Sequence, residues 1–161
     1  MPGIRRTGYT GTLVHLHFSF GLMIVALMVL RVLWRLTHAT PPLPRDTSWW
    51  QATAAQVMHF ALYVLLFLIP FAGWLWANGG GWRVTAFWIL PMPILVPKGW
   101  AYTWLASDAH VYLAVLICCL IALHILASLW HWYVKKDDVL ERMLPENKLT
   151  ARAMDYFNRF R

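Results

Sequence analysis

The stretch AHVYLAVLICCLIALHILASLWH, residues 109–131, decides the fold. It contains no Asp, Glu, Lys or Arg, and it is longer than the roughly 20 residues that a helix needs to cross a bilayer. Two further charge-free stretches lie between Gly8 and Leu30 and between Thr47 and Trp82. Backbone groups in hydrocarbon must be paired internally, so such stretches fold as helices. We therefore predict three transmembrane helices, at about 12–36, 54–77 and 108–134.

The composition supports this interpretation. Hydrophobic residues make up 60% of the 161 residues, and charged residues make up 13%. Soluble domains are typically about 45–50% apolar and about 25% charged. The excess argues against a water-soluble enzyme, and so apolar a chain is not disordered. The predicted fold class is an all-α membrane protein, a transmembrane helical bundle.

Basic residues predict the orientation of the helices. Arg31 and Arg35 cluster at the end of the first span, and Arg45 follows it. Seven more basic residues follow the third: Lys135, Lys136, Arg142, Lys148, Arg152, Arg159 and Arg161. The loop of residues 78–107 carries only Arg83 and Lys98. By the positive-inside rule, the first connection and the C-terminus are cytoplasmic, and this loop lies outside.

The net charge of +7 has a membrane explanation as well. Residues 146–161 interleave basic side chains with Leu149, Met154, Phe157 and Phe160. We expect a basic amphipathic tail on the anionic cytoplasmic leaflet, following a transmembrane domain of residues 1–145. No nucleic acid is expected as a partner.

Six histidines fall within the predicted spans: His15, His17, His59, His110, His124 and, in the last turn of the third span, His131. An ionisable residue inside a membrane span is a functional hypothesis by default. His110 and His124 are fourteen residues apart, so they share a helix face and lie about 21 Å apart along the axis. His17 is expected level with His110, and His59 level with His124. The sequence thus predicts an outer and an inner tier of histidines.

Three kinds of ligand could use these tiers. Zinc takes three or four converging ligands, commonly with Cys or carboxylate, but Cys118 and Cys119 are adjacent on one helix and point apart. A proton relay usually includes buried carboxylates. Haem with two axial histidines needs one His from each of two facing helices, apolar walls and basic residues for its propionates. No Cys-x-x-Cys-His motif occurs, so such a haem would be noncovalent. A small scaffold with core histidines remains the non-redox alternative.

Several short motifs occur in an order that resembles the bacterial cytochrome b561 family of four-helix, di-haem membrane proteins. These are His17-Phe18-Ser19-Phe20-Gly21, Arg31-Val32-Leu33-Trp34-Arg35 before Pro41-Pro42, His59-x-x-x-Tyr63 before Pro70-x-x-Gly73, His110 with His124 and His131-Trp132, and Lys136-Asp137-x-x-Leu140-x-Arg142-Met143-x-Pro145. Together they cover most of residues 13–145, and the three spans match helices 2–4 of the family.

The resemblance implies which residues bind haem b. His17 and His110 match the pair that shares the outer haem, and His124 matches an inner-haem ligand whose partner lies on the family's first helix. That helix is absent here, so we expect an N-terminally incomplete sequence, with His124 unpaired, paired with His59, or paired by another chain. His59 is otherwise expected near a haem edge, a propionate or a quinone. Arg31 and Arg35 are candidate propionate partners or headgroup anchors.

The resemblance also implies a function. We expect electron transfer through bis-His haem in the bacterial inner membrane, from superoxide to ubiquinone. As an enzyme the protein would then be a superoxide oxidase. The alternative is a haem-bearing anchor subunit of a larger dehydrogenase or hydrogenase complex. Expected partners are the lipid bilayer, quinone and superoxide, with a second copy or a partner chain supplying the absent helix.

Overall fold

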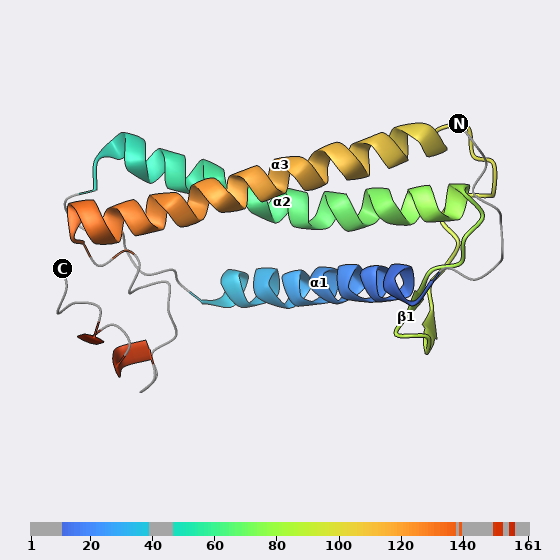
Figure 1. The fold of residues 1–161 in the computed structure, drawn as a ribbon, viewed down its shortest axis with the longest axis horizontal. Helices are drawn as coiled ribbons and strands as arrows, with labels where there is room; N and C mark the ends of the chain where they lie inside the picture. The colour runs from blue at the N-terminus through green and yellow to red at the C-terminus, as the bar shows by residue number, and fades with distance from the viewer. Residues whose placement is uncertain (1–10, 39–46, 138, 140–149, 153–154, 157–161) are drawn as a thin grey trace. The chain divides into compact units, whose positions relative to one another are not determined.

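Three long helices dominate the computed structural model, which describes residues 11–38, 47–137, 139, 150–152 and 155–156. They are α1 (Thr12–Thr37), α2 (Trp49–Gly79) and α3 (Thr103–Trp130), and the π-helical turn η1 (His131–Lys135) continues α3 (Figure 1). The strands β1 (Thr85–Ala86) and β2 (Leu90–Pro91) pair antiparallel between α2 and α3. All three helices are long and apolar enough to cross a membrane, which confirms the predicted helical membrane bundle.

Two of the helices begin earlier than the charge pattern predicts. α2 begins at Trp49 rather than at about residue 54, and the Gln51 side chain reaches back to Ser48 at its N-terminus. The backbone N–H and the hydroxyl of Ser48 both donate to Gln51 Oε1, at 3.3 and 2.9 Å. α3 begins at Thr103 rather than at about residue 108, and the Thr103 hydroxyl donates to the carbonyl of Trp100 at 2.6 Å.

The chain forms two compact units. The first contains residues 1–40 and 61–116, and therefore α1, the C-terminal part of α2, the β hairpin and the N-terminal part of α3. The second contains residues 41–60 and 117–161, and therefore the beginning of α2, the end of α3 and η1. α2 and α3 each contribute one segment to each unit.

In the first unit, the β hairpin packs against the N-terminal part of α1 (Figure 1). Ser19 of α1 is fully buried, and its hydroxyl accepts a hydrogen bond from the Phe87 backbone N–H at 2.7 Å. The same hydroxyl donates to the carbonyl of His15, also at 2.7 Å. One α1 side chain therefore fixes the tip of the hairpin.

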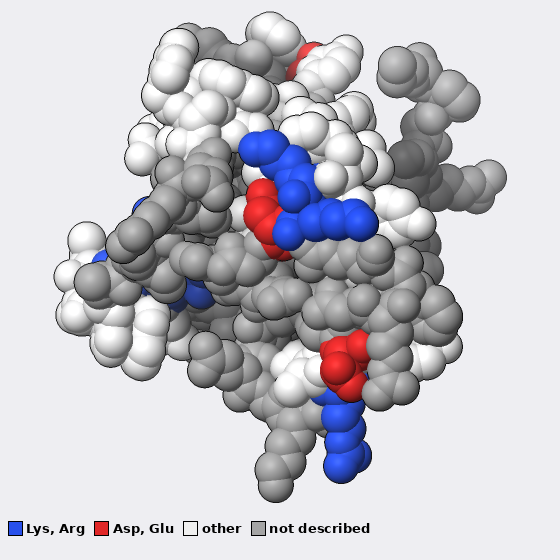
Figure 2. Space-filling view, turned by 90° about the vertical axis from the view of Figure 1, so that its left-hand side faces the viewer, with Lys and Arg blue, Asp and Glu red and all other residues white. Residues whose placement is uncertain are grey.

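Most large apolar side chains on the three helices are exposed, as expected where hydrocarbon is the surrounding solvent. Charged residues are few, and Figure 2 shows basic and acidic side chains next to each other on the face that it presents. The apolar residues of the predicted amphipathic tail, Leu149, Met154, Phe157 and Phe160, lie outside the described residues.

Candidate haem ligands

His17 and His110, the outer pair, meet in the first unit. Their ring centres are 5.9 Å apart and their planes are almost perpendicular, at 84°. His17 on α1 is exposed, and His110 on α3 is half-buried. The two residues that the resemblance assigns to the outer haem are therefore brought together by two different helices.

The His110 ring is held by the backbone of α2. His110 Nδ1 lies 2.8 Å from the carbonyl oxygen of Ile69, so its N–H donates there in the tautomer that leaves Nε2 without a proton. A metal-binding imidazole is usually oriented in this way: one ring N–H donates to a backbone carbonyl or a carboxylate, and the other ring nitrogen is left for the metal. Gly73, one turn further along α2, leaves room for the ring, because a Cβ at Gly73 would lie 2.8 Å from His110 Nδ1 and Cε1.

Aromatic rings surround the outer pair. Trp76 lies 6.0 Å from His110 between ring centres, and Phe18 lies 6.4 Å from His17 and 6.3 Å from Trp82. Beside Gly73, the buried indole N–H of Trp74 has no hydrogen-bond acceptor among the described residues. A large planar cofactor would have aromatic walls beside this pair.

The outer pair passes a simple test of fit for haem. Two metal–nitrogen bonds of about 2 Å, plus about 1 Å from each nitrogen to its ring centre, separate axial imidazoles by about 6 Å. The observed separation is 5.9 Å. His110 keeps Nε2 available, and apolar rings flank both histidines. The residues present therefore fit haem b.

His59 and His124, the inner pair, meet in the second unit. Their ring centres are 5.3 Å apart, their planes lie at 66°, and both residues are half-buried. The sequence left the partner of His124 open between His59, a histidine of another chain and none. In the structure His59 contacts His124 directly.

Neither pair is part of a larger ligand cluster. Across residues 11–38, 47–137 and the described parts of the tail, no group of three or more His, Cys, Asp or Glu side chains could hold a metal ion. A tetrahedral zinc site needs three or four such ligands, whereas haem supplies four equatorial nitrogens and needs only two axial ones. The pairing of histidines therefore favours haem over zinc.

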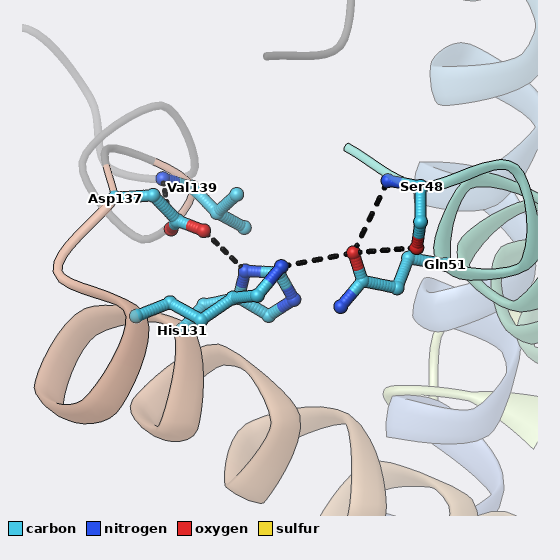
Figure 3. Close-up of polar contacts among 6 residues, drawn as sticks. Ser48, Gln51, His131, Asp137 and Val139 are labelled. Atoms are coloured by element: carbon cyan, nitrogen blue, oxygen red, sulfur yellow. Dashed lines mark hydrogen bonds and ion pairs between the residues drawn. The ribbon is translucent and has the colours of Figure 1, made fainter. Parts of the chain in front are cut away.

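The remaining described histidines have other contacts. The His15 ring lies 5.5 Å from that of Trp88 on the β hairpin. The His38 ring stacks on Trp34 at 3.7 Å, at the end of α1. His131 Nδ1 lies 2.5 Å from Asp137 Oδ2 just beyond the last helix (Figure 3). None of the three is placed by these contacts in the outer or inner pair.

Arg31 and Arg35, the two candidate propionate partners, differ in their contacts. Both Arg31 and Arg35 are exposed. The guanidinium of Arg35 lies over the ring of Tyr63, 5.9 Å from its centre, which is a cation–π contact within the first unit. Arg31 makes no ion pair with the described residues. Haem contact and headgroup contact both remain predictions for these two residues.

Three contributors to the outer site carried little signal in the sequence. The Ile69 carbonyl belongs to the backbone, so no residue type marks it. Gly73 stands in the motif Pro70-x-x-Gly73, but the ring that it accommodates is far away in the sequence. Ser19 lies between two aromatic residues of the His17 motif, and only the folded hairpin gives its hydroxyl a role.

Paired histidines on apolar helices define a membrane protein of the b-type cytochrome class. The model of one family, prokaryotic cytochrome b561, matches residues 2–146. The chain belongs to this family. Membership makes it a bacterial membrane protein that binds haem b and takes part in electron transfer.

Curated relatives agree with this assignment. Cytochrome b561 homolog 2 of Escherichia coli (strain K12) is 35% identical over 130 residues, which is 80% of this chain and 69% of the relative. A probable superoxide oxidase, CybB, of Yersinia pestis is 32% identical over 150 residues, 92% of this chain and 84% of the relative. Cytochrome b561 homolog 1 of Escherichia coli (strain K12) is 29% identical over 134 residues, 82% of this chain and 74% of the relative.

Proposed function

We propose that this chain holds haem b between His17 and His110 and transfers electrons from superoxide to ubiquinone in the bacterial inner membrane. The observation that carries the proposal is the outer pair itself, with the His110 ring anchored on the Ile69 carbonyl. His17 and His110 would hold the haem through their imidazoles. Haem held in this way suits electron transfer rather than the binding of oxygen.

The chemistry balances without a further reactant. Two superoxide ions each lose one electron and leave as dioxygen, while one ubiquinone takes up two electrons and two protons to become ubiquinol. Haem b, when bound, supplies a one-electron carrier between a one-electron donor and a two-electron acceptor. The relative from Yersinia pestis, a probable superoxide oxidase, supports this choice of reaction.

The residues of the chain contribute positioning and charge. Ile69 and Gly73 orient the His110 ring. Arg83 and Lys98 are exposed on the loop between α2 and α3 and would attract an anion such as superoxide. This loop is expected outside and the C-terminus inside, as the positive-inside rule predicts.

The test is the reaction itself, with the purified chain in detergent or vesicles. Superoxide generated in solution should reduce the bound haem, and a ubiquinone analogue should be reduced only when the haem-loaded chain is present. His17→Ala and His110→Ala should abolish this reduction. Unchanged quinone reduction in both variants would contradict the proposal, as would a purified chain without a Soret band.

The predicted orientation has a separate test. Single cysteines introduced at Lys98 and at Lys136, in a variant without Cys118 and Cys119, should react differently with an impermeant thiol reagent added to intact spheroplasts. We expect labelling at residue 98 and protection at residue 136. The reverse pattern would show that the loop lies in the cytoplasm.

A further inference from the structure

The loop between α2 and α3 contains an apolar segment that is too short to span a membrane. Residues 84–97 carry no Asp, Glu, Lys or Arg, and Arg83 and Lys98 stand at the two ends of this stretch. Six of its large apolar side chains are exposed: Phe87, Trp88, Ile89, Leu90, Ile94 and Leu95. The first four are consecutive and lie at the tip of the β hairpin. Exposed apolar clusters of this kind mark sites of interaction with a protein or a membrane.

The tip of the hairpin lies beside α1, well beyond the start of that helix (Figure 1). The Phe87 N–H donates to the Ser19 hydroxyl at 2.7 Å, and the Phe87 ring lies 5.8 Å from that of Phe20. Ser19 is about 10 Å along the axis from the first residue of α1, Thr12. The 26 residues of α1 are about 39 Å long, whereas the hydrocarbon core is about 30 Å thick. With α1 centred in the bilayer, the tip lies about 6 Å inside the hydrocarbon.

Hydrogen bonds pair backbone donors at the tip, as a loop at this depth requires. Non-helical backbone at membrane depth is tolerated where the protein itself satisfies its polar groups. The Phe87 N–H is taken by Ser19, which is fully buried under the hairpin. The Ile89 N–H donates to the carbonyl of Ala86 across the turn, at 3.0 Å. The tip therefore presents apolar side chains outward while these donors stay paired.

The turn at the tip carries two aromatic residues where hairpins usually carry Asn and Gly. Phe87 and Trp88 have positive φ of 48° and 61°, a conformation that bulky residues adopt only at a cost. Contacts with α1 offset this cost, since the Trp88 ring lies 5.5 Å from that of His15 and Ser19 holds Phe87. Aromatic side chains gain most from such a position when the tip faces the membrane, where Trp is favoured.

The apolar surface of the tip continues onto an apolar face of α1. Phe20 and Phe87 are in ring contact, and both are exposed. Met23, Ile24 and Leu27 extend the exposed face of α1 at the spacing of successive helical turns. Lipid acyl chains cover such a face of a membrane helix, so the same lipid adjoins the hairpin. Arg83 and Lys98, at the ends of the charge-free stretch, keep their charges at the membrane surface.

We propose that residues 84–97 form a membrane-dipping hairpin, which enters the leaflet beside the N-terminal half of α1 and places Trp88 and Ile89 among lipid acyl chains. The occupant of the exposed tip is therefore lipid rather than a second protein. The hairpin holds the loop that carries Arg83 close to the membrane surface. This inference requires neither haem nor quinone reduction, so it stands or falls apart from the proposed function.

The experiment measures the depth of single labels in the membrane. Ile89→Cys, Ile94→Cys and Lys98→Cys are each made in the full chain without Cys118 and Cys119. Each variant is labelled in detergent with a nitrobenzoxadiazole fluorophore and reconstituted into vesicles of phosphatidylcholine and phosphatidylglycerol. The quenchers are iodide in the water and nitroxide groups on the lipid acyl chains. Helical content by circular dichroism checks that each variant folds like the parent chain.

The label at residue 89 should be quenched strongly by nitroxide lipid and several-fold less by iodide than the label at residue 98, which is the control in water. Residue 94 should be intermediate, because the N–H of its neighbour Leu95 donates to Asn78 Oδ1 at the end of α2, at 2.8 Å. Leu90→Cys places a second label at the tip and should behave like Ile89→Cys, so the result does not depend on one substitution.

Two results would overturn the inference. Equal quenching by iodide at residues 89, 90 and 98 would show that the tip lies in water. Tip labels shielded from both iodide and nitroxide lipid would show that protein covers the hairpin, from a second copy or from another segment of the chain.

Discussion

The outer and inner histidine pairs reach similar ring separations, 5.9 and 5.3 Å, by different means. In the outer pair one imidazole is fixed directly, since His110 Nδ1 donates to a backbone carbonyl of α2. In the second unit, which holds the inner pair, a polar clamp joins the beginning of α2 to the end of the last helix, because Gln51 Oε1 accepts hydrogen bonds from Ser48 Oγ and from Lys135 Nζ. The hydrogen bond to the Ile69 carbonyl restrains the His110 ring directly.

This difference predicts how each pair responds to change. A ring held by its own hydrogen bond should be sensitive to any atom placed beside it. For the inner pair, we expect small changes at the helix ends to have little effect on the contact between the two rings. The following substitutions test this contrast, beginning with the strongest effect.

Replacing His110 by Ala should have the largest effect. One imidazole cannot complete six-coordinate iron, so the outer haem should be lost or become high-spin, and its affinity should fall by more than the roughly 10–100-fold cost of an outer-shell change. Haem content and spin state measure this, and His38→Ala is the control. If the outer and inner pairs are independent, the inner signal persists. Retention of two low-spin haems would show that His110 is not a ligand.

Replacing Gly73 by Ala should have the second-largest effect. The added Cβ would lie 2.8 Å from the His110 ring, which is closer than van der Waals contact allows, so the ring must leave the Ile69 carbonyl. We expect outer-haem affinity to fall by about 10–100-fold, with the inner haem unchanged. Gly11→Ala adds the same methyl where nothing lies within 4 Å, and it should have no such effect. An outer haem bound as tightly as before would mean that His110 has room to move.

The sequence could predict the features that depend on the pattern of neighbouring residues. The charge-free stretches predicted three membrane helices, and the spacing of His110 and His124 placed both on one face, because hydropathy and helical period are properties of neighbouring residues. The spacing Ser48-x-x-Gln51 at the start of α2 is also typical of a helix N-terminus, and the Gln51 side chain accepts the Ser48 N–H there.

What the sequence could not predict are contacts between distant segments. The contact between His59 and His124 depends on the register of two helices. The anchor of His110 is a backbone atom of Ile69, which any residue type would offer. The role of Ser19 depends on a hairpin whose tip residues, Phe87 and Trp88, have positive φ of 48° and 61°, although such turns favour Asn and Gly.

The Ser19 hydroxyl tests whether the outer unit depends on this hairpin. In Ser19→Ala the Phe87 N–H loses its acceptor, and the left-handed conformation of Phe87 and Trp88 loses a restraint. We expect the hairpin to open more readily by about 1–3 kcal/mol, measured as faster amide exchange at residues 87–89. Thr53→Ala removes a hydroxyl that donates to a carbonyl of its own helix, and it should leave this exchange unchanged. Equal protection in both variants would show that Ser19 does not hold the hairpin.

The clamp on the inner pair should give the smallest effect. Gln51→Ala removes the acceptor shared by Ser48 and Lys135, and the lost cap should cost about 1 kcal/mol of stability. Because the substitution removes no histidine of either pair, the haem content and the outer low-spin signal should stay unchanged. Gln56→Ala makes the same substitution at an exposed position of α2 and serves as the control. A broadened outer signal would contradict the contrast between the pairs, because the clamp would then restrain the outer pair as well.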